Sequence, residues 1–169
     1  IDQFYFKWFA NLYVILVAPP GVVAKTTTAD IGMDLLRRVP TVQCGPSVVS
    51  WQALVQSFGQ SATAFQDPIS GEYLTQSAMT ISSGEFGNLL NPQDKEMVDM
   101  LVNLWDGKGF RKVTKHSGTD DVVNPWINLI ACTTPAWIAG NFPEYMIGGG
   151  FTSRCVFVYA DQKERYVAY

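Results

Sequence analysis

A lysine followed by three threonines stands where an apolar segment gives way to a helical pattern. Residues 18–26 read APPGVVAKT, with Gly21 ahead of Lys25 and Thr26. In loops that bind phosphate, backbone N–H groups surround the phosphate oxygens, a lysine ammonium reaches the terminal phosphates, and the next hydroxyl binds magnesium. The predicted phosphate site comprises Pro20, Gly21, Val22, Val23, Ala24, Lys25, Thr26 and Thr27. Thr26 is the predicted magnesium ligand.

This segment departs from the usual phosphate-loop pattern in two ways. Ala18 and Ala24 stand where glycines are usual, and one extra residue separates Gly21 from Lys25. The alternative is a plain turn between a strand and a helix, in which Lys25 faces solvent. The context favours phosphate binding, because an apolar strand precedes the loop and the N-terminus of a helix, which attracts anions, follows it.

A second candidate, Glu85, follows the apolar run that ends near Ser82. Enzymes that cleave nucleotide phosphates need an acidic group at the end of a neighbouring strand, where it orients the attacking water. Ser83 and Gly84 stand where a metal-binding aspartate often precedes that group. Either a serine oxygen acts on the metal through water, or hydrolysis is slow. The alternative for Glu85 is a glutamate that caps a surface loop.

Thr134 and Arg154 complete the set of candidate catalytic residues. Thr133 and Thr134 end a buried apolar run, where a polar residue such as Thr134 can sense the terminal phosphate; the alternative is that Thr133 caps the short helix that begins near Pro135. Arg154 follows GGGFTS and can act across a subunit boundary on the transferring phosphoryl group, or it can form an ordinary ion pair. Lys163 and Arg165 are alternative candidates for this action across a subunit boundary.

Composition narrows the classes of function. The formal net charge of −3 leaves no broad positive surface for nucleic acid, so any DNA contact must be local. Basic residues gather between Lys108 and His116, where a solvated strand edge is the alternative. His116 is the single histidine, and no serine or cysteine nucleophile motif accompanies it. The three cysteines are scattered, which argues against a disulfide framework and a zinc site and favours a reducing cytosol.

The periodicity of apolar residues predicts alternating strands and helices. Strands are expected at 12–17, 78–81, 110–114, 126–132 and 154–159. Helices are expected at 25–38, 47–58 with Ser47 as N-cap, 91–105 beginning at Asn91 or Pro92, and briefly after Thr134. A surface loop is expected at 59–71 and a turn at Asp120 and Asp121.

This order of elements predicts a three-layer α/β fold with a mostly parallel central sheet. The 169 residues suit one domain spanning 1–169, and the initial Ile favours a fragment of a longer chain. The apolar run at 12–17 is only six residues long, so no membrane segment is expected.

Four segments in this order resemble a known family: APPGVVAKTTT, ISSGEFGNLL, NPWINLIACTTP and GGGFTSRCVFVY. Together they are similar to the P-loop ATPase module of phage and mobile-element replication proteins, a helicase-primase family with RecA-like cores. The resemblance covers most of the chain from residue 12. It implies an ATP and Mg²⁺ site at 21–26, an acidic catalytic position at Glu85, a sensor near Thr134 and an arginine at Arg154.

The same resemblance implies the biological setting. Family members often adjoin a primase or another DNA-processing domain and assemble into homo-oligomeric rings, and single-stranded DNA in the host-cell cytoplasm is the expected partner. The competing class is a non-catalytic module that binds nucleotide or docks on DNA, for which five tryptophans and the basic segment are suitable. A viral DNA-packaging motor is a nearer rival, because it also uses a P-loop core.

Overall fold

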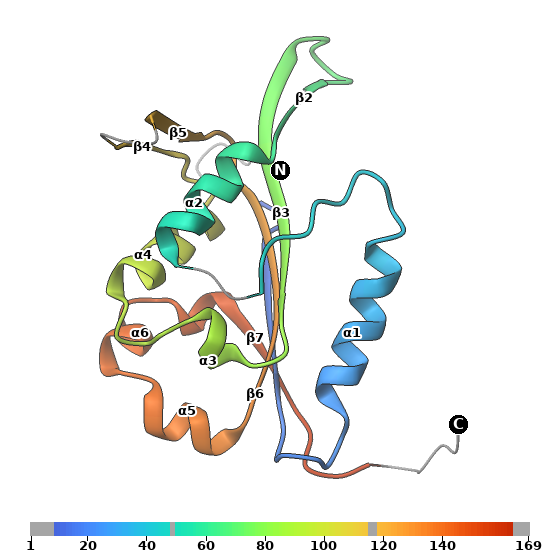
Figure 1. The fold of residues 1–169 in the computed structure, drawn as a ribbon, viewed down its shortest axis with the longest axis vertical. Helices are drawn as coiled ribbons and strands as arrows, with labels where there is room; N and C mark the ends of the chain where they lie inside the picture. The colour runs from blue at the N-terminus through green and yellow to red at the C-terminus, as the bar shows by residue number, and fades with distance from the viewer. Residues whose placement is uncertain (1–8, 48–49, 115–117, 164–169) are drawn as a thin grey trace.

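The computed structural model describes residues 9–47, 50–114 and 118–163 and shows a mixed sheet with helices on both faces (Figure 1). The sheet has five strands in the order β2-β3-β6-β1-β7. Its strands are β1 (Leu12–Val17), β2 (Ala62–Gln66), β3 (Tyr73–Ser83), β6 (Trp126–Thr133) and β7 (Cys155–Tyr159). Strands β3, β6, β1 and β7 run parallel, whereas β2 pairs with β3 in antiparallel orientation. The predicted α/β fold with a mostly parallel sheet is confirmed.

One helix covers one face of the sheet, and the remaining helices cover the other (Figure 1). The helix that lies alone is α1 (Lys25–Leu36). The opposite layer contains α2 (Trp51–Gln60), α3 (Phe86–Leu89), α4 (Lys95–Trp105), α5 (Pro135–Asn141) and α6 (Glu144–Gly148). A separate hairpin is formed by β4 (Phe110–Thr114) and β5 (Gly118–Val122). Within the described ranges, no helix combines the length and the apolar character that a membrane span requires.

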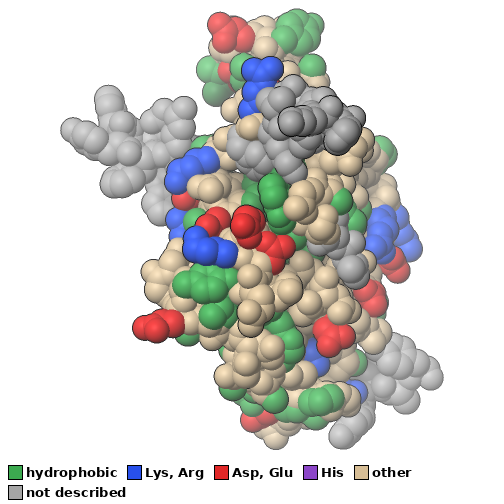
Figure 2. Space-filling model, turned by 60° about the vertical axis from the view of Figure 1, so that its left-hand side comes forward, with side chains coloured by type: hydrophobic (Ala, Val, Ile, Leu, Met, Phe, Trp, Pro, Cys, Tyr) green, Lys and Arg blue, Asp and Glu red, His purple; other side chains and the backbone are tan. Residues whose placement is uncertain are grey.

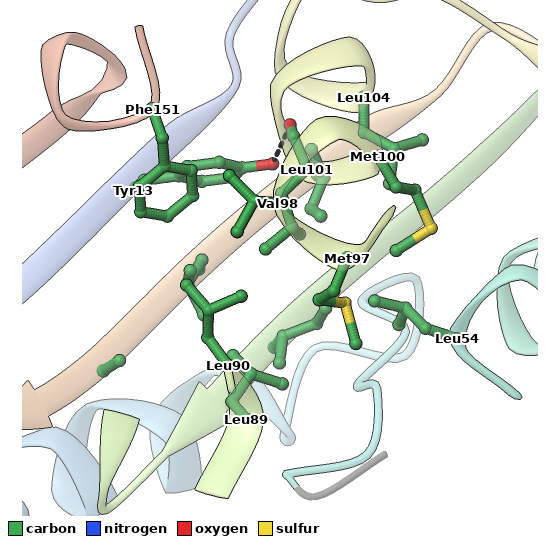
Figure 3. Packing of buried hydrophobic residues seen from close by; sticks show 14 of the residues in the cluster. Tyr13, Leu54, Leu89, Leu90, Met97, Val98, Met100, Leu101, Leu104 and Phe151 are labelled. Carbon is green, nitrogen blue, oxygen red and sulfur yellow. Dashed lines mark hydrogen bonds between the residues drawn. The ribbon is translucent and has the colours of Figure 1, made fainter. Parts of the chain in front are cut away.

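The main core lies between the sheet and the multi-helix layer (Figure 3). Tyr13, Ile15 and Val17 alternate along β1 and are buried on this side, because successive side chains of a strand point to opposite faces. The Tyr13 hydroxyl donates a hydrogen bond of 2.8 Å to the carbonyl of Leu101 on α4. Burial without that partner would leave a phenolic group unsatisfied, so the bond fixes α4 over β1.

The opposite face of β1 is less completely covered. Leu12 begins the strand and is 51% exposed, and its neighbours on this face, Val14 and Leu16, are half-buried. A short continuous apolar run such as residues 12–17 is typical of a strand buried on both faces, but β1 is fully buried on one face only. The reason lies in tertiary structure, since α1 alone packs over this side.

Helix boundaries differ from the predicted ones because other side chains cap them. Helix α2 begins after Ser50, whose hydroxyl accepts from the N–H of Ala53, and not after Ser47. Helix α4 begins after Asp94, whose carboxylate accepts from the N–H of Met97, and not at residues 91–92. A side chain that satisfies a free N–H group of the first turn decides where a helix starts.

Two predictions about loops are wrong. The loop expected at 59–71 contains β2, and the turn expected at Asp120 and Asp121 lies within β5. Both strands are fixed by antiparallel pairing, β2 with β3 and β5 with β4. Neither strand has the alternation of apolar residues that would reveal it, because β2 packs no side chain into the core and β5 is largely polar.

Candidate functional site

The predicted phosphate loop leaves the sheet at the carboxyl end of its inner strand β1. Both neighbouring strands hold this point: the N–H of Ala18 donates to the Thr133 carbonyl at 3.2 Å, and the N–H of Ala160 donates to the Val17 carbonyl at 3.1 Å. The chain leaves β1 toward α1 on one face, whereas it leaves β6 toward α5 on the other (Figure 1). In open α/β sheets, ligands bind at the carboxyl edge where successive connections diverge in this way.

The start of α1 leaves backbone donors outside the helical hydrogen-bond ladder. The N-cap residue Ala24 offers no side-chain cap, and the first bond of the ladder runs from the N–H of Thr28 to the Ala24 carbonyl at 3.0 Å. The N–H groups of Lys25, Thr26 and Thr27 therefore have no partner within the helix. Free N–H groups together with the positive end of the helix dipole form a suitable site for an anion.

Ala24 adopts the left-handed conformation, with φ of 50° and ψ of 38°. A residue with a Cβ atom pays about 1–2 kcal/mol for this conformation, and glycine avoids that cost. Gly21, in the same loop, also has a positive φ of 71°. Thus Ala24 has the backbone conformation that glycine favours, although its side chain departs from the usual sequence pattern.

We expect Ala24→Gly to raise the free energy of unfolding by up to about 1 kcal/mol, because relief of the strain exceeds the entropy that glycine adds to the unfolded chain. Urea denaturation measures the change. Ala53→Gly in the exposed first turn of α2 is the matched control and should lower the free energy of unfolding by roughly 0.5–1 kcal/mol. Equal destabilisation by both substitutions would contradict the prediction.

The loop that carries Glu85 packs against the start of α1. A Cβ atom built on Gly84 would lie 3.1 Å from Cγ2 of Thr26, although the two residues come from different connections. Glu85 is exposed, occupies the N-cap position of α3, and accepts a hydrogen bond of 2.7 Å from the Ser83 hydroxyl at its backbone carbonyl. The structure thus brings the loop of the predicted catalytic carboxylate to the predicted magnesium ligand.

The two serines at the end of β3 point to opposite faces of the sheet. Ser83 is buried on the core side with Met79 and Ile81, and its hydroxyl is already bonded to the carbonyl of Glu85. Ser82 is half-buried and belongs to the other face, where α1 lies. Of these two hydroxyls, the one suited to reach a metal through water is therefore that of Ser82, which the sequence reasoning did not single out.

A buried thiol lies beneath the start of α1. Along β6, Cys132 points to the same face of the sheet as Asn128 and Ile130, and those two residues line the α1 side. Burial raises the pKa of the Cys132 thiol, while the nearby Thr26 hydroxyl and Lys25 ammonium act in the opposite direction. The sequence analysis did not identify Cys132 as a site residue. The signal that could have identified it is the alternation of side chains along β6, which turns Cys132 toward the α1 face.

Thr134 acts as the N-cap of α5. Its hydroxyl oxygen accepts from the N–H of Trp137 at 3.2 Å, so Thr134 caps this helix and the cap considered at Thr133 is one residue out. Thr134 is half-buried at the carboxyl end of β6, beside the strand that leads into the phosphate loop. Its role as a sensor of phosphate stays a prediction.

Arg154 lies at the opposite end of the sheet from the predicted phosphate loop. It precedes β7, whereas the loop follows the carboxyl end of the parallel strand β1, and the five residues of β7 span about 17 Å. Its guanidinium makes two hydrogen bonds to the Asp106 carboxylate, at 2.9 and 3.0 Å, and lies 5.4 Å from the centre of the Trp105 ring. Action on a neighbouring subunit stays a prediction and would require release from Asp106.

The rival cations for the same role have different positions. Lys163 follows Ala160 and therefore lies beyond the carboxyl end of β7, closer along the chain to the edge of the phosphate loop than Arg154. Arg165 lies outside the described residues.

The predicted basic segment is partly balanced by acidic residues. Lys108 forms an ion pair with Asp106 at 3.2 Å, and Arg111 on β4 stands in register with Asp121 on β5. Lys112 is likewise in register with Asp120, while Lys115 and His116 lie outside the described residues. Opposite charges in register reduce the local positive potential that a DNA backbone would meet.

Magnesium would find few protein ligands at this edge. Over residues 9–47, 50–114 and 118–163, no group of three His, Cys, Asp or Glu side chains is placed to hold a metal ion. Mg²⁺ that arrives with a nucleotide keeps waters and phosphate oxygens as most of its ligands, so a threonine hydroxyl suffices as an anchor. The donors at Thr26 and Ser82 are oxygens and thus fit this metal.

Two cavities lie away from the carboxyl edge. One of about 470 Å³ separates α2 from α4 and is lined by Trp51, Met100, Glu96 and Asp99 among others. Its two carboxylates would repel phosphates. The other, an apolar groove of about 230 Å³, lies between α1 and the sheet. The lysine that lines the larger cavity, Lys108, is paired with Asp106, and the lining of the groove is almost entirely apolar.

Comparison with known protein families and curated proteins gives no match from which a function could be inferred. The chain matches no protein-family model, and no curated protein sequence matches it.

Proposed function

We propose that this chain binds Mg-ATP at residues 20–27 and hydrolyses it, as the ATPase core of a phage or mobile-element replication helicase. The observation that carries the proposal is the contact between Gly84 and Thr26. It brings an acidic loop to a helix start whose N–H groups are free and which carries a lysine and a threonine hydroxyl.

Each group at this edge has a chemical task in the proposal. The N–H groups of residues 25–27 and the Lys25 ammonium bind the β- and γ-phosphates, which develop negative charge as the phosphoryl group leaves. The Thr26 hydroxyl anchors Mg²⁺, which neutralises phosphate charge when it is bound. The Glu85 carboxylate is exposed beside this site and orients the attacking water.

The link to DNA rests on fewer observations. Four segments resemble replication ATPases, and the sheet presents the ends of the first three of them, those of β1, β3 and β6, at one edge. In this proposal the chain works in a homo-oligomeric ring beside a primase or a similar domain, and single-stranded DNA is its partner. Arg111 on β4 is exposed and offers a local contact for a phosphate.

The residues at the end of β3 favour a second candidate function, which is nucleotide binding without hydrolysis. No carboxylate stands at positions 82–84, and the Ser83 hydroxyl is committed to the carbonyl of Glu85. A site with a weak metal ligand set can bind nucleotide and release it unchanged, which would make the chain a non-catalytic assembly or docking module. A DNA-packaging motor would also hydrolyse ATP at this site and would differ from a helicase only in its partners.

Glu85→Gln separates these functions. We expect the variant to release phosphate about 100-fold more slowly than the parent, because water orientation by a general base contributes that much or more. Its affinity for Mg-ATP should stay within about twofold, since Gln keeps the size of the side chain. Steady-state phosphate release with and without single-stranded DNA, together with titration of a fluorescent ATP analogue, measures both quantities.

The matched control is Glu96→Gln, at an exposed position on α4 away from this edge, and it should leave both quantities unchanged. Parent protein that binds Mg-ATP without releasing phosphate in either condition would establish the non-catalytic function. Turnover that persists in Glu85→Gln would exclude Glu85 as the residue that orients water.

A further inference from the structure

The β2–β3 hairpin projects from one end of the molecule and carries apolar side chains at its tip. Figure 1 shows the hairpin extending beyond the sheet, and Figure 2 shows hydrophobic and acidic side chains on the same projection. Every residue of β2 is exposed, Ile69 in the turn is 94% exposed, and Tyr73 is 78% exposed. A cluster of large apolar side chains held in water marks a contact surface.

The turn at the tip is built by its own hydrogen bonds. The Asp67 carboxylate accepts from the N–H groups of Ile69 and Ser70 and from the Ser70 hydroxyl, the last at 2.6 Å. Gly71 has a φ of 73°, which suits glycine, and its N–H donates to the carbonyl of Asp67. The backbone at Ile69 is thus held by the turn, so little backbone entropy is lost when a partner buries this residue.

An apolar groove on the same molecule has room for such a tip. It measures about 230 Å³ and lies between α1 and the sheet, on the face that α1 covers alone. Leu12, Val14, Met33 and Ile130 contribute apolar lining, and Gly32 on α1 opens onto it. The low polarity of this groove suits a branched aliphatic side chain.

The hairpin tip is acidic, whereas the C-terminal end of α1 beside the groove is basic, with Asp30 and Asp34 preceding it on the same helix. The hairpin carries Asp67 and Glu72 and has no lysine or arginine between residues 62 and 77. The end of α1, next to the groove residue Leu36, carries Arg37 and Arg38. Of these two arginines, only Arg37 takes part in an ion pair within the described ranges, with Asp34, so Arg38 remains available to an incoming carboxylate.

We propose that the hairpin of one copy inserts Ile69 into the α1 groove of a second copy, with Asp67 and Glu72 facing Arg37 and Arg38. Tip and groove are different surfaces, so two copies can exchange hairpins across a two-fold axis, or the contact can repeat head-to-tail from copy to copy. Repetition of the contact produces a ring where the rotation closes. The acidic hairpin is unsuited to DNA and to anionic membranes, which leaves a protein surface as its partner. This inference does not rest on nucleotide binding.

The first test is self-association of the 169-residue chain, measured by sedimentation velocity over a range of concentrations. We expect concentration-dependent oligomers in the parent, and a dissociation constant raised at least tenfold in Ile69→Asp, since the tip side chain loses its apolar burial. Gly32→Leu should have a similar effect by filling the groove, because a Cβ atom at Gly32 meets nothing within 4 Å. Ile147→Asp, at an exposed position on α6, is the control and should associate like the parent.

The second test identifies the partner surfaces. Glu72→Arg and Arg38→Glu should each weaken association, and the double variant should recover it, because the pair is restored with reversed sign. A bismaleimide should join Ile69→Cys in one tagged copy to Gly32→Cys in another, in a background with Cys44→Ser.

Three results would overturn the inference. These are a chain that stays monomeric at every concentration, association that both Ile69→Asp and Gly32→Leu leave intact, and the absence of any cross-link between the copy with Ile69→Cys and the copy with Gly32→Cys. Because none of these measurements includes nucleotide, their failure is distinguishable from a failure of ATP binding.

Discussion

Lys25→Ala is expected to weaken Mg-ATP binding about 10- to 100-fold. The lysine opens α1, directly after the loop that both neighbouring strands fix at the carboxyl edge. Hydrogen bonds between a charged donor and phosphate contribute roughly 1.5–3 kcal/mol each, and alanine removes both the bond and the charge. Fluorescence titration with an ATP analogue measures the loss.

Two further substitutions make this test specific. Lys25→Arg keeps the positive charge and should retain part of the affinity, although its planar group differs in shape from an ammonium. Lys95→Ala removes an exposed lysine of α4 that pairs with Asp99, and it should leave nucleotide affinity unchanged. Parent-like affinity in Lys25→Ala, with the fold intact by circular dichroism, would remove the phosphate-site assignment.

Phe86→Ala is expected to lower the free energy of unfolding by about 3–5 kcal/mol, the usual cost of a buried aromatic cavity. Phe86 follows Glu85 directly and is fully buried. Its ring lies 5.5 Å from Trp137, 6.1 Å from Phe142 and 6.3 Å from Phe151, measured between ring centres. This aromatic cluster therefore anchors the loop that carries Glu85 to α5 and to the segment that leads into β7.

Urea denaturation of Phe86→Ala and the parent measures the effect. Phe65→Ala on the exposed hairpin is the matched control and should cost less than about 1 kcal/mol, because its side chain is 40% exposed and its strand packs nothing into the core. A loss below about 1 kcal/mol for Phe86→Ala would show that the cluster does not hold the loop. Phe86→Leu, which refills most of the cavity, should recover part of the stability.

Local patterns carried most of the successful predictions. The strand at 12–17 appears with the predicted bounds, because a short β-branched apolar run followed by a turn is a local signal. Helix α1 begins at Lys25 as expected and ends two residues before the predicted boundary. Strand β2 escaped prediction because only its pairing with β3, far from the core, makes it a strand.

The sequence by itself determined which groups are available for chemistry and the order in which strands, loops and helices present them. It placed Lys25 and Thr26 at a helix start and Glu85 after a strand, since these positions follow from local periodicity.

Only the tertiary structure decided which of these groups meet. Strand β6 lies between β1 and β3 in the sheet, and the loop after β3 still reaches Thr26 after β1. Arg154, in contrast, lies at the other end of the sheet, where it pairs with Asp106. The physical reason is that strand order and direction depend on hydrogen bonds and packing between segments distant in sequence, which no local pattern encodes.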